Sequence, residues 1–186
     1  DTRYWWTAAI DGDTIALGSR NIFEETAQVY VYEKPAEGWR TMKETAVLRP
    51  SDLPPKRYFG ERYQVAIDGD SIVVGIPDAN SPLTGRLPQV GSVYLYQKTG
   101  EHWNTMRETA QLHVDAPNHV ELESLGASVS IQGDTVAALD PRLKLYNPDT
   151  GRLIGYGGIF LFDISEIDTF VLNPQVSILG TMEDTL

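Results

Sequence analysis

The sequence predicts an all-β protein built from three tandem copies of one four-stranded antiparallel unit. Three observations predict it: a short turn phrase occurs three times, an alternating strand-like phrase follows each copy, and a segment that begins with Trp occurs twice almost letter for letter. The turn glycines Gly12, Gly69 and Gly133 recur roughly every 60 residues, which is the length of one supersecondary unit. We therefore expect three structural repeats within a single domain.

The first two strands of each unit are predicted by the threefold turn phrase. It occupies residues 9–15, 66–72 and 130–136. The turn pair is Asp-Gly in the first two copies and Gln-Gly in the third, it is followed by Asp in all three, and alternating β-branched residues flank it. An Asp-Gly pair in this setting supplies the positive φ angles that a tight hairpin turn requires. Each copy therefore predicts a hairpin, and we expect the aspartates to satisfy nearby backbone groups.

The third and fourth strands are predicted by the two other recurring phrases. Residues 29–34 and 93–98 alternate two faces and are rich in Tyr and Val, and residues 159–162 take this place in the third unit. The segment at residues 39–48 recurs at 103–112, and we interpret it as an outer strand. The third unit has no copy of this segment, so residues 169–172 or 176–179 are expected to supply its last strand.

Four strands joined by a tight turn, a loop and a second turn are typical of one β-propeller-type blade. We place the three blades roughly at residues 1–52, 53–118 and 119–186 of one domain, and expect the surplus length of the longer repeats to lie in loops. Propellers have about 4–8 blades, so three units predict an incomplete or open propeller with uncovered flanks.

The repeats resemble the FG-GAP family, the repeats of integrin α-chain propellers and of bacterial and algal surface proteins. The resemblance spans roughly residues 4–163 and rests on the threefold turn phrase, on Phe-Gly at 59–60 and Leu-Gly at 125–126, and on Gly-Ile-Pro at 75–77. It implies a propeller fold and an extracellular or cell-surface location. The calcium loop of integrin-type repeats is not carried over to the turns at Asp11 and Asp68, because a two-residue turn cannot surround an ion that takes six to eight oxygen ligands.

Two other loops contain candidate metal ligands. Asp78 and Asn80 in one loop, and Asn147 and Asp149 in the other, offer carboxylate and amide oxygens of the kind that bind Ca²⁺. The same residue types are also typical of ordinary turns. Calcium is thus the one candidate cofactor.

The tryptophans suggest packing at two positions and binding at two others. Trp39 and Trp103 occupy the same place in two repeats, which favours packing between blades. Trp5 and Trp6 are neighbours on a predicted strand, so one ring should face away from the core if the alternation holds. We therefore hold Trp5 and Trp6 as candidate partner-binding residues.

The sequence predicts no catalytic residues. The Gly-Asp-Ser triplet at 69–71 lies inside a repeated hairpin, and the Gly-x-Ser phrase at 126–128 lacks the strand-to-helix turn of a nucleophile elbow. The three His residues show no metalloprotease spacing and are expected at the surface, and the chain contains no Cys. We therefore expect a protein that is not an enzyme.

A formal charge of -11 makes nucleic acid and anionic lipid improbable partners. No apolar run approaches the roughly 20 residues that cross a bilayer, so no membrane insertion is expected. The chain opens at Asp1 without an initiator Met, and we expect a processed form or a part of a longer chain.

Together these observations predict a non-catalytic extracellular or cell-surface interaction or structural module. It is expected to bind protein, above all copies of itself, through exposed blade edges, with a glycan as a further candidate partner. The alternatives are a calcium-dependent or lectin-like adhesion domain and a fragment of a propeller hydrolase.

Overall fold

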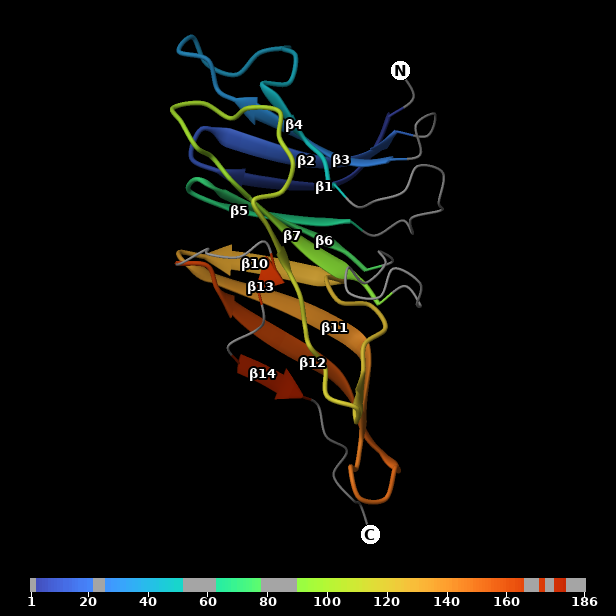
Figure 1. Ribbon diagram of the computed structural model, residues 1–186. Helices are drawn as coiled ribbons and strands as arrows, with labels where there is room; N and C mark the ends of the chain where they lie inside the picture. The colour runs from blue at the N-terminus through green and yellow to red at the C-terminus, as the bar shows by residue number, and fades with distance from the viewer. Residues whose placement is uncertain are drawn as a thin grey trace.

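The computed structural model describes residues 3–21, 26–51, 63–77, 90–165, 171–172 and 176–179. All elements in these ranges are β-strands, and they form three separate sheets that follow one another along the chain (Figure 1). The prediction of an all-β protein with three four-stranded antiparallel units is therefore confirmed. In the described ranges, no helical segment has the length and hydropathy to span a lipid bilayer.

Each sheet is a meander in which consecutive strands pair. The first sheet has the order β1 (Arg3–Asp11), β2 (Thr14–Asn21), β3 (Thr26–Glu33), β4 (Ala46–Leu48). The second has β5 (Gln64–Asp68), β6 (Ser71–Ile76), β7 (Ser92–Gln97), β8 (Ala110–Leu112), with β13 (Val171–Leu172) parallel to β8. The third has β10 (Ser128–Gln132), β11 (Thr135–Tyr146), β12 (Leu153–Asp163), β14 (Val176–Leu179), with β9 (Val120–Glu121) added to β11.

The three tight turns form as the recurring phrase predicts. Gly12, Gly69 and Gly133 have φ angles of 51, 54 and 53°, which a residue with a Cβ adopts only at a cost. The carbonyl of the Asp that follows each Gly accepts an N–H from the end of the third strand at 2.8 Å in all three units. Each hairpin is thereby tied to its third strand at the same point.

The fourth strands are shorter than the Trp-initiated segments predict: β4 and β8 have only three residues each. The Thr residue that precedes each strand ends the ladder. The hydroxyl of Thr45 accepts the N–H of Glu33 at 3.1 Å, and that of Thr109 accepts the N–H of Gln97 at 2.9 Å. A side-chain oxygen thus replaces the backbone acceptor that a longer strand would supply.

The third unit differs from the prediction in where its extra residues lie. They do not form a loop between the second and third strands: β11 and β12 continue as a hairpin that projects beyond β10 and β14 (Figure 1). Leu143 and Leu145 alternate with polar residues there and are buried, and β9 pairs with the same segment. Of the two segments expected as the last strand, β14 pairs with β12, whereas β13 pairs with the second sheet.

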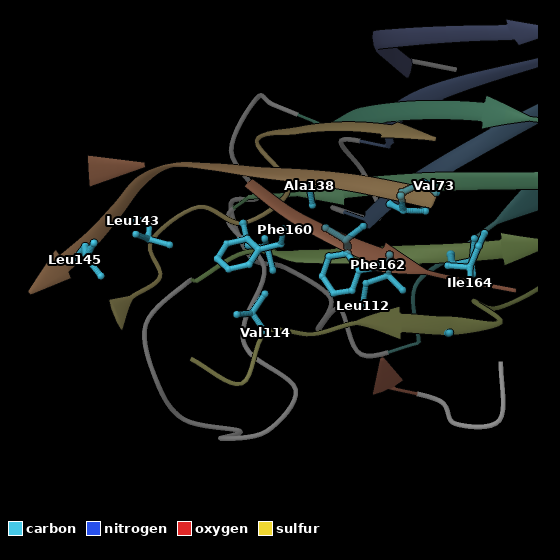
Figure 2. Close-up of a cluster of buried hydrophobic side chains, with 14 residues drawn as sticks. Val73, Leu112, Val114, Ala138, Leu143, Leu145, Phe160, Phe162 and Ile164 are labelled. Carbon is cyan, nitrogen blue, oxygen red and sulfur yellow. The ribbon is translucent and has the colours of Figure 1, made fainter. Parts of the chain in front are cut away.

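The core lies between successive sheets. One cluster fills the space between the first and second sheets, and another fills the space between the second and third. Figure 2 shows the second cluster, with Phe160 and Phe162 of β12 beside Val114 and Leu112. The first strands of the sheets are spatial neighbours, since β5 lies beside both β1 and β10. Each sheet therefore buries its apolar residues against its neighbour.

Candidate interaction surfaces

Each sheet has two faces, named here by the neighbour they contact. The leading face is turned toward the preceding sheet, and the trailing face toward the following sheet. In the second sheet both faces are buried: Ile72, Val74, Tyr96 on the leading face and Val73, Val93, Leu95 on the trailing face. The turn phrase and the third-strand phrase align the other sheets with it, so each position of these two phrases has counterparts in the other two units.

Two of the six faces are not packed against another sheet of the described chain. The leading face of the first sheet carries Ile15, Leu17 and Tyr32, the counterparts of Ile72, Val74 and Tyr96. The trailing face of the third sheet carries Ala137, Ile159 and Leu161, the counterparts of Val73, Val93 and Leu95. All six are partly exposed or exposed, whereas their counterparts in the second sheet are buried. For these six residues the position in the array accounts for the difference. Tyr30 of the same leading face, the counterpart of Tyr94, is buried at 3% exposure, so the leading face is only partly open.

The exposed large hydrophobic side chains of the described residues concentrate on these two faces. They are Ile10 at 64%, Tyr156 at 53%, Trp39 at 43% and Ile159 at 38% exposure. The counterparts of Ile10 in the other units, Ile67 and Ile131, pack against the two core clusters. Only Tyr156 lies elsewhere, on the projecting part of β12. Singly exposed apolar residues are ordinary, but clustered ones indicate a contact surface.

Trp39 and Trp103 occupy the same position in two repeats and differ in their exposed fraction, because only Trp103 has a preceding sheet to pack against. Trp103 is 2% exposed and belongs to the cluster between the first and second sheets, so the prediction of packing between units is confirmed for it. Its backbone N–H donates to Glu33 Oε1 at 3.2 Å, across the junction. For Trp39 the prediction is wrong: its ring is 43% exposed, because no described sheet precedes the first one.

Trp39 instead borders a groove of about 290 Å³ on the leading face. Ile15 and Leu17 of β2, Tyr32 of β3 and Met42 also line this groove. Its walls are therefore mostly apolar and aromatic, and Arg40 and Thr41 complete the lining.

At both internal junctions, a segment of the following unit pairs with the outer strand of the preceding sheet. We call this segment the clasp; it is the stretch around Met106 at the first junction and β13 at the second. Met106 of the second unit forms a parallel bridge with Leu48 of β4, where its N–H donates to the Val47 carbonyl at 3.2 Å and its carbonyl accepts the Arg49 N–H at 3.1 Å. At the next junction β13 pairs in parallel with β8, and Leu172 is opposite Leu112, the counterpart of Leu48. Each unit thus covers the outer edge of the preceding sheet, which protects an edge that would otherwise be open to pairing.

The tight turns are also linked from unit to unit. Asp11 Oδ2 accepts the N–H of Gly69 at 2.8 Å, and Asp68 Oδ2 accepts the N–H of Gly133. The expectation that these aspartates satisfy their own local backbone is therefore wrong, because the carboxylates reach the turn of the following unit. The third unit has Gln132 at this position, so the residue that would continue the series is an amide.

Glycines allow the second and third sheets to approach closely. A Cβ on Gly75 would lie 2.2 Å from the carbonyl oxygen of Gly126. Leu125 bridges Gly91 in parallel, and its N–H donates to the Val90 carbonyl at 2.9 Å. The Leu-Gly pair and the Gly-Ile-Pro element, both noted in the sequence, therefore meet at one junction. The third unit has Leu139 where the others have Gly18 and Gly75.

The candidate calcium residues are placed only in part. Asp78 and Asn80 lie outside the described residues. Asn147 and Asp149 lie at the tip of the projecting hairpin, where Asn147 Oδ1 accepts the N–H groups of Asp149 at 3.0 Å and Thr150 at 2.9 Å. This is the geometry of an Asx turn. Within the described ranges, no three His, Asp or Glu side chains are grouped as metal ligands, and calcium stays a prediction.

Trp5 and Trp6 lie on β1, and their side chains are outside what the structure describes. Trp5 is opposite Ser19, and the register shifts between Trp5 and Thr7. The strict alternation on which the binding role depended is therefore interrupted at Trp6. The role of both residues as contacts stays a prediction.

The histidines occupy three different settings. His102 lies at the surface, with Nδ1 3.2 Å from Glu33 Oε2, and His119 is partly exposed. His113 is buried, so the expectation of a surface residue is wrong there, and this burial lowers the pKa of His113 against a smaller opposing effect of Asp115. Burial penalises the charged imidazolium.

The residues that define the two open faces were not identified as a site from the sequence. The signals were present as breaks in the repeat: Gln132 replaces an Asp, and Leu139 replaces a Gly, both in the third unit. Neither the protein-family models nor the curated proteins compared with this chain match it.

Proposed function

We propose that this chain is a non-catalytic structural and interaction module that associates with copies of itself, and that its three sheets are β-propeller-type blades. One observation carries the proposal. Both internal junctions pack a leading face on a trailing face, while the two outermost faces carry Trp39, Ile10 and Ile159 at 38% exposure or more. Burying such side chains contributes about 1.5–3 kcal/mol each, which favours a partner.

The assignment as propeller-type blades is supported by the order within and between sheets. Each sheet is a four-stranded meander, and the first strands β1, β5 and β10 are neighbours. Sheets that repeat around their first strands while their last strands lie outward are the arrangement of a propeller. The resemblance to FG-GAP repeats supports the same assignment and a location outside the cell or on its surface.

Asp140 and the turn aspartates have structural roles, which supports the proposal of a non-catalytic module. The buried carboxylate of Asp140 accepts the N–H groups of Glu123 at 2.9 Å, Ser124 at 3.1 Å and Arg142 at 3.0 Å, and the Ser124 hydroxyl at 2.8 Å. A carboxylate with four donors stabilises a fixed backbone geometry. The turn aspartates likewise join neighbouring units.

Size-exclusion chromatography with light scattering, at rising protein concentration, tests the proposal. We expect the mean mass to rise above that of a single chain as concentration increases. Added salt should strengthen the association, because the charge of -11 makes copies repel one another and salt screens this repulsion. A mass that stays at one chain up to about 1 mM, the range of very weak affinities, would contradict self-association.

A further inference from the structure

We infer that two copies associate head to tail, with the leading face of the first sheet of one copy seated on the trailing face of the third sheet of the next. This inference rests on the proposed self-association and specifies its geometry. Its basis is that the two internal junctions already pair a leading face with a trailing face. The open faces are the two unused halves of that same junction.

The residues of the two open faces match those of a junction that exists. Between the first and second sheets, Ile72, Val74 and Tyr96 pack on the trailing residues Ala16, Val29 and Val31. In the inferred contact, Ile15, Leu17 and Tyr32 take the leading positions, and Ala137, Ile159 and Leu161 take the trailing positions. The side chains of the inferred contact are therefore close in size and shape to those of the existing junction, as packing without a change of volume requires.

The segment that pairs with the edge of β4 has a repeat copy at the leading end. Residues 39–44 repeat residues 103–108, so Met42 corresponds to Met106, which bridges Leu48 on the edge of β4. At the trailing end the outer strand is β14, and Ile178 is opposite Ile159 just as Leu48 is opposite Val29. Met42 of one copy is therefore expected beside Ile178 of the next, with Trp39 covered as Trp103 is.

Polar residues also stand at the positions of these links in the two outermost units. Gly12 corresponds to Gly69, whose N–H binds Asp11 Oδ2 at 2.8 Å, and Gln132 corresponds to Asp11. In the inferred contact, the amide oxygen of Gln132 of one copy can accept the N–H of Gly12 of the next copy. An amide adds no negative charge to a contact between two acidic chains. Asp163 stands in the place of Glu33, which accepts the N–H of Trp103, and its Oδ1 already accepts the N–H of Ser165 at 2.9 Å and the Ser165 hydroxyl at 2.6 Å.

A head-to-tail contact explains these features better than a two-fold one. Two leading faces together would present two clasps and no strand edge to receive them, and two trailing faces would present two edges and no clasp. A head-to-tail contact leaves a new open face at each end, so it produces a ring if its rotation closes and a filament if it does not. Leu139 prevents the close approach that Gly75 and Gly126 make, so this contact should be weaker than the internal junctions and concentration-dependent.

Two charge substitutions test the inference by complementation. Trp39→Glu disables the leading face, and Ile159→Glu disables the trailing face. Each variant alone should bind itself at least about 100-fold more weakly than the unaltered chain, because hot-spot aromatic and aliphatic anchors dominate such contacts. Mixed together, each variant still contributes one intact face, so analytical ultracentrifugation should show a heterodimer and nothing larger.

The matched control is Tyr156→Glu. Tyr156 lies on the same strand as Ile159 and is also exposed, at 53% against 38%, but it lies on the projecting hairpin. Its counterpart Val90 contributes a backbone carbonyl to an internal junction, and the substitution of Tyr156 leaves the backbone carbonyl in place. This variant should associate as the unaltered chain does. Circular dichroism and thermal unfolding check that all three variants are folded.

A second measurement uses the absence of Cys from the sequence. A mixture of the Met42→Cys and Ile178→Cys variants should form a disulfide between chains under mild oxidation, whereas Met42→Cys mixed with Tyr156→Cys should not. If the unaltered chain stays monomeric, both the inference and the proposed function fail. If it associates but the glutamate variants associate equally well, or no mixed disulfide forms, only the head-to-tail geometry is overturned.

Discussion

Trp39 and Trp103 are the same side chain in the same recurring phrase, and their environments are opposite. Trp103 is 2% exposed because the first sheet lies against it, while Trp39 is 43% exposed. A repeat sequence therefore encodes a contact that only some copies can complete within one chain. The position of the copy in the array decides which ones.

This pair gives a prediction for stability. Trp103→Ala should lower the free energy of unfolding by about 3–5 kcal/mol, because it removes a large buried side chain and leaves a cavity. Trp39→Ala should lower it by less than about 1 kcal/mol, as expected at an exposed site. Urea unfolding at a concentration where the chain is monomeric measures both. Equal losses would show that the two rings are buried to the same degree.

His113 gives a prediction for pH dependence. Burial lowers its pKa below the ordinary value of 6.5, so the unfolded chain binds this proton more readily than the folded chain. The contribution of neutral His113 is therefore complete above the unfolded-state pKa, and it is lost as the pH falls from there toward the folded-state pKa.

Thermal unfolding between about pH 7 and about pH 5 tests this expectation, since the interval brackets the ordinary titration of His. The unaltered chain should lose stability over this interval, and His113→Gln should lose less. His119→Gln, measured in parallel, shows whether the effect is particular to the buried position of His113. An unchanged pH dependence in His113→Gln would assign the effect to other groups.

At the scale of the element, the junction between the second and third sheets depends on close backbone contact. Gly75 lies in β6, and its Cα has room for no side chain because the carbonyl of Gly126 is in the way. A larger residue would push the third sheet away from a cluster that includes Phe160 and Phe162. Interiors of this density transmit such a displacement.

Gly75→Ala should therefore lower the free energy of unfolding by about 1–3 kcal/mol, the typical cost of overpacking. Gly100→Ala is the matched control, because a Cβ there would have nothing within 4 Å. Chemical denaturation of both variants measures the difference. Similar midpoints for the two would show that the sheets accommodate the added methyl group without strain.

The elements also show how far sequence reasoning reached. The hairpins and third strands were predicted because turn glycines and alternating residues act locally. The short fourth strands were not predicted, because a Thr hydroxyl replaces the backbone acceptor at the start of each one. The pairing of β13 with β8 was not predicted, because it depends on a neighbouring sheet. Uncovered flanks were expected from the count of three units, but the residues on them were not identified. A residue such as Trp39 has the sequence of a core residue and the exposure of a surface one.

For the whole molecule, the central claim is that three similarly packed sheets leave two complementary faces that other copies cover. Electron microscopy of the chain, at a concentration where it associates, tests this claim most directly. We predict rings or fibres in which every copy contacts the next in the same orientation. Single wedge-shaped particles at every concentration, or pairs related by a two-fold axis, would contradict it.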